Sequence, residues 1–387
     1  MKLRYDVIVL GAGAMGMAAG YYLSQKGVNT LMIDAFDPPH SRGSHHGDTR
    51  LIRHATGEGS VYAPIAVRSQ QLWNELAEQT DETIFRRTGV LTFGENDADF
   101  VRNAISAGLT IDTPVETLSG KEIHRRWPGI RLPEDSIGSY EPKAGVLFSE
   151  NCIRAYRRLA LENGAELLTH APVTNVDVKE DYVTVQTEHG VYSADKLIVS
   201  GGAWNKKILE DLNLNISIYP SRRTIAWFDA DDSLYNSEDF PGFIGKYPEG
   251  QYYGFPSFDG GGVKIGRYDD GEFVDPDQIT IGFGAYDKDE RDLRDFLEEY
   301  MPGAAGDLNM GKACMFTNTP DRDFVVDFHP GHSNVVIAAG FSGHGFKFAS
   351  GIGEILSDLV TEGQTDMDIS KFSAQRPVLY QESTEAG

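Results

Sequence analysis

The stretch "YDVIVLGAGAMGMAAGYYLSQKGVNTLMIDAFD", residues 5–37, decides the fold. Its first apolar residues predict a buried strand that runs directly into a glycine-rich turn. A helix is predicted over 14–26 and closed by Gly27, and a second strand over 29–34 ends at Asp34. The turn has the G-x-G-x-x-G spacing, in Gly11, Gly13 and Gly16.

This unit has the chemistry of a dinucleotide site. The glycines allow a tight turn and let the backbone approach a pyrophosphate at the helix N-terminus, where free N–H groups and the helix dipole favour anions. Asp34 stands where a carboxylate accepts hydrogen bonds from ribose hydroxyls. The glycine motif alone is a weak signal. Strand, helix, second strand and terminal acid in register predict dinucleotide binding.

Two distant segments complete the nucleotide fold. "DKLIVSGGAW" (195–204) is a second apolar strand that ends in small residues. "NVVIAAGFSGHGFKFASGIGEILSDLV" (334–360) predicts a strand, a glycine-rich loop and a helix beginning near Ala349. Such a helix directs its positive end at an electron-rich ring. The discontinuous layout is typical of FAD oxidoreductases, so FAD is the expected cofactor.

The intervening sequence predicts a second domain. Short apolar stretches such as "TIAWFDADD" and "GGVKIGRY" alternate with turn residues and predict antiparallel strands. "DERDLRDFLEEYMPG" (289–303) predicts an amphipathic helix that ends at Pro302. We therefore predict an α/β protein, with a Rossmann-like FAD-binding domain of discontinuous segments and an α+β substrate domain with an antiparallel sheet. The predicted FAD-binding segments are 1–86, 145–216 and 313–387, and the substrate segments are 87–144 and 217–312.

The composition excludes several classes of protein. A net charge of −23 over 387 residues argues against nucleic acid, because binding phosphates requires a basic face. No run approaches the 18 or so apolar residues of a membrane span, so no membrane partner is expected. Two cysteines give no disulfide framework, which favours the cytoplasm. We expect no metal site.

The segment "SHHGDTRLIRH" (44–54) concentrates cations in an acidic chain. A solvated polar loop is the ordinary interpretation, but this segment closely follows the ribose-binding strand. Arg53 and Lys347 together suit a substrate carboxylate, the arginine as a bidentate donor and the lysine as a point charge. Lys264 lies among glycine and apolar residues on a predicted strand, which favours an inward-pointing side chain. The alternatives are a surface position for Lys347 and an edge-strand position for Lys264.

Cys314, in "GKACMFTNTPDRDF" (311–324), is one of only two cysteines. Free cysteine packs as a small hydrophobic residue, so a buried structural role is the first interpretation. The other cysteine, Cys152, lies in a helical pattern and is expected in the core.

Long motifs across the chain resemble the monomeric sarcosine oxidases and N-methyltryptophan oxidases. The motifs are "DAFDPPHSRGSHHGDTRLIRHATGEG", "GVLFSENCIRAYRRLA", "QYYGFPSF", "ACMFTNTPDRDFVVDFHP" and "NVVIAAGFSGHGFKFASG". The resemblance implies FAD bound covalently through the thiolate of Cys314. It implies oxidation of the C–N bond of a secondary, N-methyl amino acid with O2, giving amine, aldehyde and H2O2. It also implies a monomer.

The resemblance assigns roles to particular residues. Lys264 matches the lysine that favours oxygen reduction near the flavin, and Arg53 and Lys347 match the carboxylate-binding pair. The positions expected to line the flavin or the substrate cavity and to serve catalysis are Arg50, His46, Tyr253 and His344, beside Lys264. The expected cofactor contacts are Gly11, Gly13, Ala14, Met15, Gly16, Asp34, Ser44, Thr49, Arg50, Val173, Gly202, Cys314, Gly343, Gly345, Phe346 and Lys347.

Two positions depart from the family pattern and concern the substrate. Tyr268 replaces a histidine four residues after the strand lysine, and Phe316 stands where sarcosine oxidases often have tyrosine. Tyr268 is expected to contact substrate. Its neutral, bulkier side chain favours a larger N-methyl or cyclic secondary amino acid over sarcosine, because an apolar or aromatic side chain gains binding energy from buried area. The alternatives are a flavin dehydrogenase with a non-oxygen acceptor, an oxidase of a cyclic or primary amino acid, and a flavoprotein retained for binding only.

Overall fold

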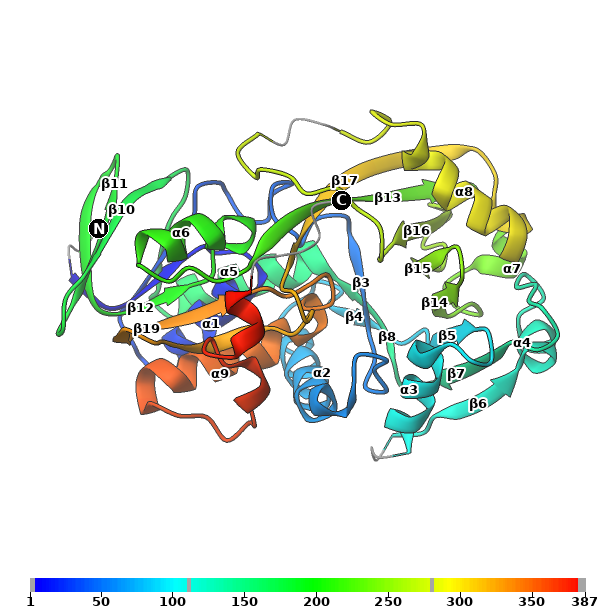
Figure 1. Ribbon diagram of the computed structural model, residues 1–387, viewed down its shortest axis with the longest axis horizontal. Helices are drawn as coiled ribbons and strands as arrows, with labels where there is room; N and C mark the ends of the chain where they lie inside the picture. Colours follow the sequence, from blue (N-terminus) through cyan, green and yellow to red (C-terminus); the bar gives the residue numbers. More distant parts are fainter. Residues whose placement is uncertain (1–3, 110–112, 279–281, 382–387) are drawn as a thin grey trace.

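The computed structural model describes residues 4–109, 113–278 and 282–381. Two large sheets lie in two lobes along the long axis of the molecule, with a small three-stranded sheet between them (Figure 1). None of the helices in this part of the chain is long and apolar enough to cross a membrane.

The first lobe is built on the sheet that begins with β1, as the apolar strand of residues 5–10 predicts. Its path is β10-β11-β12-β1-β2-β9, with β19 beside β12 and β18 beside β19. The strands β1, β2, β9, β12 and β19 pair in parallel, which is why β1 and β2 are almost wholly buried and apolar. The strands are β1 (Arg4–Leu10), β2 (Thr30–Ile33), β9 (Glu166–Leu168), β10 (Val173–Val178), β11 (Val183–Thr187), β12 (Gly190–Val199), β18 (Val325–His329) and β19 (His332–Ala339).

Helices pack against one face of this sheet around α1, whose buried small residues allow close contact with α9. A Cβ on Gly353 would come within 2.5 Å of the Cβ of Ala18, so the two helices touch through backbone. α1 ends one residue earlier than predicted, and Gly27 follows with φ +74°. The helices on this face are α1 (Ala14–Gln25), α2 (Ala63–Ala77), α5 (Ser149–Glu162) and α9 (Ala349–Glu362), whereas α6 (Asn205–Asp211) packs against the opposite face.

The second lobe contains a sheet in the order β17-β13-β16-β15-β14-β5-β7-β6. It is antiparallel, as predicted, except where β14 and β5 pair in parallel. The strands are β5 (Val90–Gly94), β6 (Glu116–Ser119), β7 (Ile137–Glu141), β13 (Tyr219–Phe228), β14 (Gly242–Tyr247), β15 (Gly250–Phe255), β16 (Val263–Arg267) and β17 (Leu308–Asn318). The helices are α3 (Asp99–Gly108), α4 (Gly120–Arg126), α7 (Asp232–Tyr235) and α8 (Lys288–Tyr300).

Strand β17 joins the two lobes. It pairs with β13 from Leu308 as far as Asn318 and so runs past the predicted domain boundary at residue 312. The small sheet of β3 (Thr49–Ile52), β8 (Gly145–Phe148) and β4 (Phe85–Arg86) gives a second connection. Among the cations predicted at the site, Arg50 lies on β3 of the small sheet and Arg53 follows it, whereas Lys264 lies on β16 of the second large sheet.

Candidate active site

The turn between β1 and α1 has the geometry that a dinucleotide requires. Gly11 has φ +91°, and a Cβ there would lie 2.5 Å from the carbonyl oxygen of Ser200. A Cβ on Gly16 would lie 1.9 Å from the oxygen of Gly11, so only glycine lets the helix close on the turn. Gly13 caps α1 without a side chain, which leaves the first N–H groups of the helix available to an anion.

Asp34 lies at the end of β2 and is held in place by the same turn. Its Oδ2 accepts a hydrogen bond from the backbone N–H of Ala12 at 2.8 Å, and its Oδ1 accepts one from Phe36 at 2.9 Å. His40 Nε2 lies 3.3 Å from Oδ1. The carboxylate is therefore fixed before any ribose arrives.

A cavity of about 570 Å³ opens beside this turn and accommodates a large ligand. Most of the predicted cofactor contacts line it. They are Gly11, Gly13, Ala14, Met15, Asp34, Ser44, Arg50, Val173, Gly202, Gly343, Gly345 and Phe346. The remaining four, Gly16, Thr49, Cys314 and Lys347, lie outside its lining. Gly16 packs closely against Gly11, and the carbonyl oxygen of Thr49 accepts a hydrogen bond from Arg50; Gly11 and Arg50 both line the cavity.

Arg50 and Lys264 organise the loop that leads into β3. The Nη2 of Arg50 donates to the carbonyl oxygens of Ser44 and His46, both at 2.7 Å. Lys264 is buried at 2% exposure, and its Nζ donates to the carbonyl oxygen of Gly47 and to both oxygens of Thr49. Burial, assisted by the charge of Arg50, holds the pKa of Lys264 well below its usual value.

His46 also belongs to this buried cluster. Burial and the charge of Arg50 lower the pKa of His46 to about 4, so the ring is neutral at neutral pH. Its Nε2 is buried and has no hydrogen-bond partner among the described residues. His46 itself does not line the cavity beside the β1–α1 turn.

Cys314 lies in β17, directly opposite Arg223 of β13, and is 5% exposed. Burial raises the pKa of its thiol, and the charges of Arg50, Lys264 and Arg223 oppose that rise. The neighbouring Met315 accepts a hydrogen bond at its carbonyl oxygen from Ser44, a residue of the large cavity. The thiol thus lies among cations beside the cavity, whereas Cys152 is buried in the helical core.

A smaller cavity of about 70 Å³ adjoins the large one. Arg50, Phe316, Gly343 and Phe346 line both. The predicted substrate residues gather around the smaller cavity, although they come from β15, the end of β16, the segment after β3 and the loop after β19. They are Arg53, Tyr253, Tyr268, His344 and Lys347.

Glu58, which the sequence does not single out, already pairs with both predicted carboxylate-binding cations. Its Oε2 lies 3.0 Å from Arg53 Nη2, and its Oε1 lies 3.8 Å from Lys347 Nζ. The charges of Arg53 and Lys347 overcome burial and lower the pKa of Glu58 strongly. Burial lowers the pKa of Lys347 to about 7, although the charge of Glu58 opposes this.

His344 and Tyr268 form another part of this cavity. His344 Nε2 bonds to the carbonyl oxygen of Arg322 at 3.1 Å, and burial lowers the pKa of His344 to about 4. Its Nδ1 is buried without a partner among the described residues. The hydroxyl of Tyr268 donates to the oxygen of Ser342 at 2.9 Å, and burial raises the pKa of Tyr268 to about 12.

Known proteins resemble this chain over its whole length. Residues 6–359 match the family model described as FAD dependent oxidoreductase. The chain is 56% identical over 381 residues to the monomeric sarcosine oxidase of Bacillus sp. (strain B-0618), covering 98% of each. It is 42% identical to the N-methyl-L-tryptophan oxidase of Escherichia coli O81 (strain ED1a), covering 97% of this chain and 100% of the relative. The chain belongs to the sarcosine oxidase family of FAD-dependent oxidoreductases.

Solved structures share the fold of this family at lower identity. L-proline dehydrogenase from P. horikoshii superposes with a TM-score of 0.85 at 21% identity, covering 97% of this chain and 98% of that one. The amino acid oxidase NikD superposes with a TM-score of 0.84 at 22% identity, covering 96% and 98%. Family membership confirms the predicted α/β fold and FAD as the cofactor.

The sequence offered a weak signal for Glu58. It follows Arg53 by five residues within the family-like motif "RHATGEG", but an acid between two glycines is usually a solvated turn residue.

A second acid, Glu141 of β7, anchors the start of this segment. Its carboxylate accepts hydrogen bonds from the backbone N–H groups of His54 and Ala55 and contacts the ring of His54. Arg53 therefore extends from a fixed backbone.

Proposed function

We propose that this chain oxidises the C–N bond of an N-methyl or other secondary amino acid, using covalently bound FAD and O2. The products are the amine, the aldehyde and H2O2, with water supplying the aldehyde oxygen. The observation that carries the proposal is the shared wall of the two cavities. It brings the carboxylate-binding cations next to the predicted flavin site.

The residues present fit FAD. The backbone of the β1–α1 turn leaves room for a pyrophosphate, and Asp34 lines the large cavity in a position suited to the ribose. When bound, FAD accepts two electrons from the substrate and passes them to O2. We assign its covalent attachment to Cys314, because the thiol lies beside the cavity and among three cations that favour the thiolate.

The protein orients the substrate through its carboxylate. Arg53 and Lys347 bind this group once Glu58 leaves them, because a ligand carboxylate supplies the same charge to the same cations. Tyr253 and His344 border the space in which the amine lies. The unpartnered Nδ1 of His344 suits a hydrogen bond from the substrate N–H, because the neutral ring already uses Nε2 on Arg322.

Lys264 supplies electrostatic stabilisation of reduced oxygen. Three oxygen acceptors hold its Nζ in a buried position. The ammonium group therefore does not have to move when negative charge forms nearby, so the stabilisation costs little reorganisation energy. We further propose that the chain acts as a monomer in the cytoplasm. The sarcosine oxidase of Bacillus sp. is named monomeric, and both cysteines are free in the structure.

A panel of secondary and primary amines tests the function. Sarcosine, N-methyl-tryptophan, proline, pipecolate and glycine are each supplied under air, and peroxide release is measured. At least one secondary amine should yield H2O2 in proportion to amine consumed. Substrate-dependent reduction of an artificial dye without peroxide under air would instead identify a dehydrogenase.

A further inference from the structure

Two aromatic rings form one wall of the smaller cavity, and a guanidinium group lies against each. Tyr268 and Phe316 both line this cavity, with their ring centroids 6.0 Å apart. The Cζ of Arg322 lies 5.9 Å from the Tyr268 centroid, and the Cζ of Arg223 lies 5.1 Å from the Phe316 centroid. Two guanidinium groups therefore contact Tyr268 and Phe316, the two residues of this wall that depart from the family pattern.

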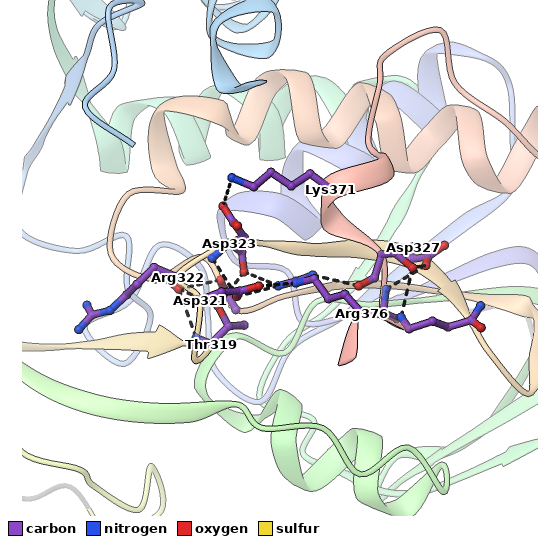
Figure 2. A network of polar contacts seen from close by, with 12 residues as sticks. Thr319, Asp321, Arg322, Asp323, Asp327, Lys371 and Arg376 are labelled. Atoms are coloured by element: carbon purple, nitrogen blue, oxygen red, sulfur yellow. Dashed lines mark hydrogen bonds and ion pairs between the residues drawn. The ribbon is translucent and has the colours of Figure 1, made fainter. Parts of the chain in front are cut away.

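Arg322 is directed to this place by its backbone. It has φ +62°, an unusual value for a residue with a side chain, and such conformations often mark functional sites. The acids on either side of it are engaged elsewhere: Asp321 pairs with Arg376 at 2.7 Å, and Asp323 pairs with Lys371 at 3.0 Å. Figure 2 shows the side chain of Arg322 extending away from this network. Its Nη1 is buried and has no hydrogen-bond partner among the described residues.

Arg223 is more deeply buried, at 4% exposure. Its Nη1 donates to the carbonyl oxygen of Arg222 at 3.1 Å, and its Nε lacks a hydrogen-bond partner in the described part of the chain. Burial and the charge of Arg322 lower its pKa. Gly271 makes room for it, since a Cβ there would lie 1.3 Å from Arg223 Nη1. The local sequence thus accommodates a buried cation.

The missing counter-charge is the unusual feature. Among the described residues, 4–109, 113–278 and 282–381, no carboxylate forms an ion pair with Arg223 or Arg322. This is unexpected in a chain with 58 acidic residues and only 35 lysines and arginines. The adjacent Arg222, in contrast, is paired with Asp289 through two bonds of 2.7 and 2.8 Å. A buried cation without an acid is costly unless a ligand supplies the charge.

We propose that Arg223 and Arg322, beside the rings of Phe316 and Tyr268, bind a second carboxylate at the end of the substrate side chain. The preferred substrate is then a secondary amino acid with an acidic side chain, such as an N-methylated dicarboxylic amino acid. The inference rests on the proposed function and differs from the apolar or aromatic side chain that the sequence favours. The first carboxylate belongs to Arg53 and Lys347, and the second meets the guanidinium groups that lie over the Tyr268 and Phe316 rings.

The experiment compares an acid with its isosteric amide. The values of kcat/KM for N-methyl-L-glutamate and N-methyl-L-glutamine are measured for the wild type and for Arg322→Gln, Arg223→Gln and Arg322→Lys. The wild type should favour the acid by about 10-fold or more, as expected for hydrogen bonds to charged groups. Each glutamine variant should reduce that ratio towards one, and Arg322→Lys should retain most of it.

Arg267→Gln is the matched control, because Arg267 lies on the adjacent strand and is already paired with Asp292 at 3.1 Å. It should leave the ratio unchanged. Sarcosine has no side chain, so its turnover should be similar in the wild type, Arg322→Gln, Arg322→Lys and Arg267→Gln, which shows that these variants are folded. A wild-type ratio of one or less, or a ratio that survives in both glutamine variants, overturns the inference. If no secondary amine, sarcosine included, releases peroxide, the proposed function fails and this inference fails with it.

Discussion

Replacing Glu58 by glutamine should strengthen the binding of simple carboxylates. Glu58 places its own carboxylate against Arg53 and Lys347, so a ligand carboxylate must displace it. Two unit charges 4 Å apart attract by about 4 kcal/mol at an effective dielectric constant of 20. The ligand regains most of this attraction, and the displaced Glu58 regains hydration. The competition between Glu58 and the ligand that remains is about 1–3 kcal/mol, or roughly 5- to 150-fold in Kd.

Acetate suits the assay, because it has a carboxylate but no amine that titrates. Its Kd is measured calorimetrically at pH 6 for the wild type, Glu58→Gln and Glu58→Asp. The low pH is needed because the charge of Glu58 raises the pKa of Lys347, and its loss would bring that pKa below about 7. Glu58→Asp keeps the negative charge and should bind acetate nearly as the wild type does. Equal or weaker binding by Glu58→Gln would refute the idea that Glu58 competes with the substrate.

Three further changes address the flavin, oxygen and pH. In Cys314→Ser, acid precipitation should release all flavin, whereas in the wild type the flavin should stay with the polypeptide; free flavin from the wild type would disprove the attachment. Lys264→Met should slow aerobic reoxidation by on the order of 10²–10³ and anaerobic reduction far less, as timed by stopped flow; equal slowing of both steps would remove Lys264 from the oxygen role. Since Lys347 is cationic below its pKa of about 7 and neutral above it, acetate affinity should fall as pH rises through 7. Lys347→Met should abolish that dependence, and a persistent dependence would assign it to another group.

The nucleotide half of the fold is predictable because its signals are local. The apolar strand, the glycines and Asp34 all lie within residues 5–37. Most of the contacts that require these residue types are made within the same unit, and one is made with Ser200, which lies close to Gly11. The inward position of Lys264 is also evident, since its strand neighbours are glycine and apolar residues. The pairing of β5 with β14 is not predictable in this way, because about 150 residues separate the two strands.

The charges around the substrate cavity were harder to predict. A glutamate between glycines and an arginine between aspartates both resemble surface residues in the sequence. Only the fold shows that Glu58 faces Arg53 and that the acids beside Arg322 pair with Arg376 and Lys371. Sequence patterns report which residues are charged, whereas the partner of each charge depends on contacts between distant segments.

The continuous pairing of β17 with β13 limits how this protein can be recombined with its relatives. Ten residue pairs connect the two strands from Phe228↔Leu308 to Tyr219↔Asn318, with one register shift between Trp227 and Phe228, and both Cys314 and Phe316 lie within the regular part of that ladder. A chimaera that exchanges substrate sheets at residue 312 would divide the strand and combine two unmatched ladders. Exchange would have to move residues 219–228 and 308–318 as one block. The proposed flavin anchor and one wall of the substrate cavity would then be inherited together.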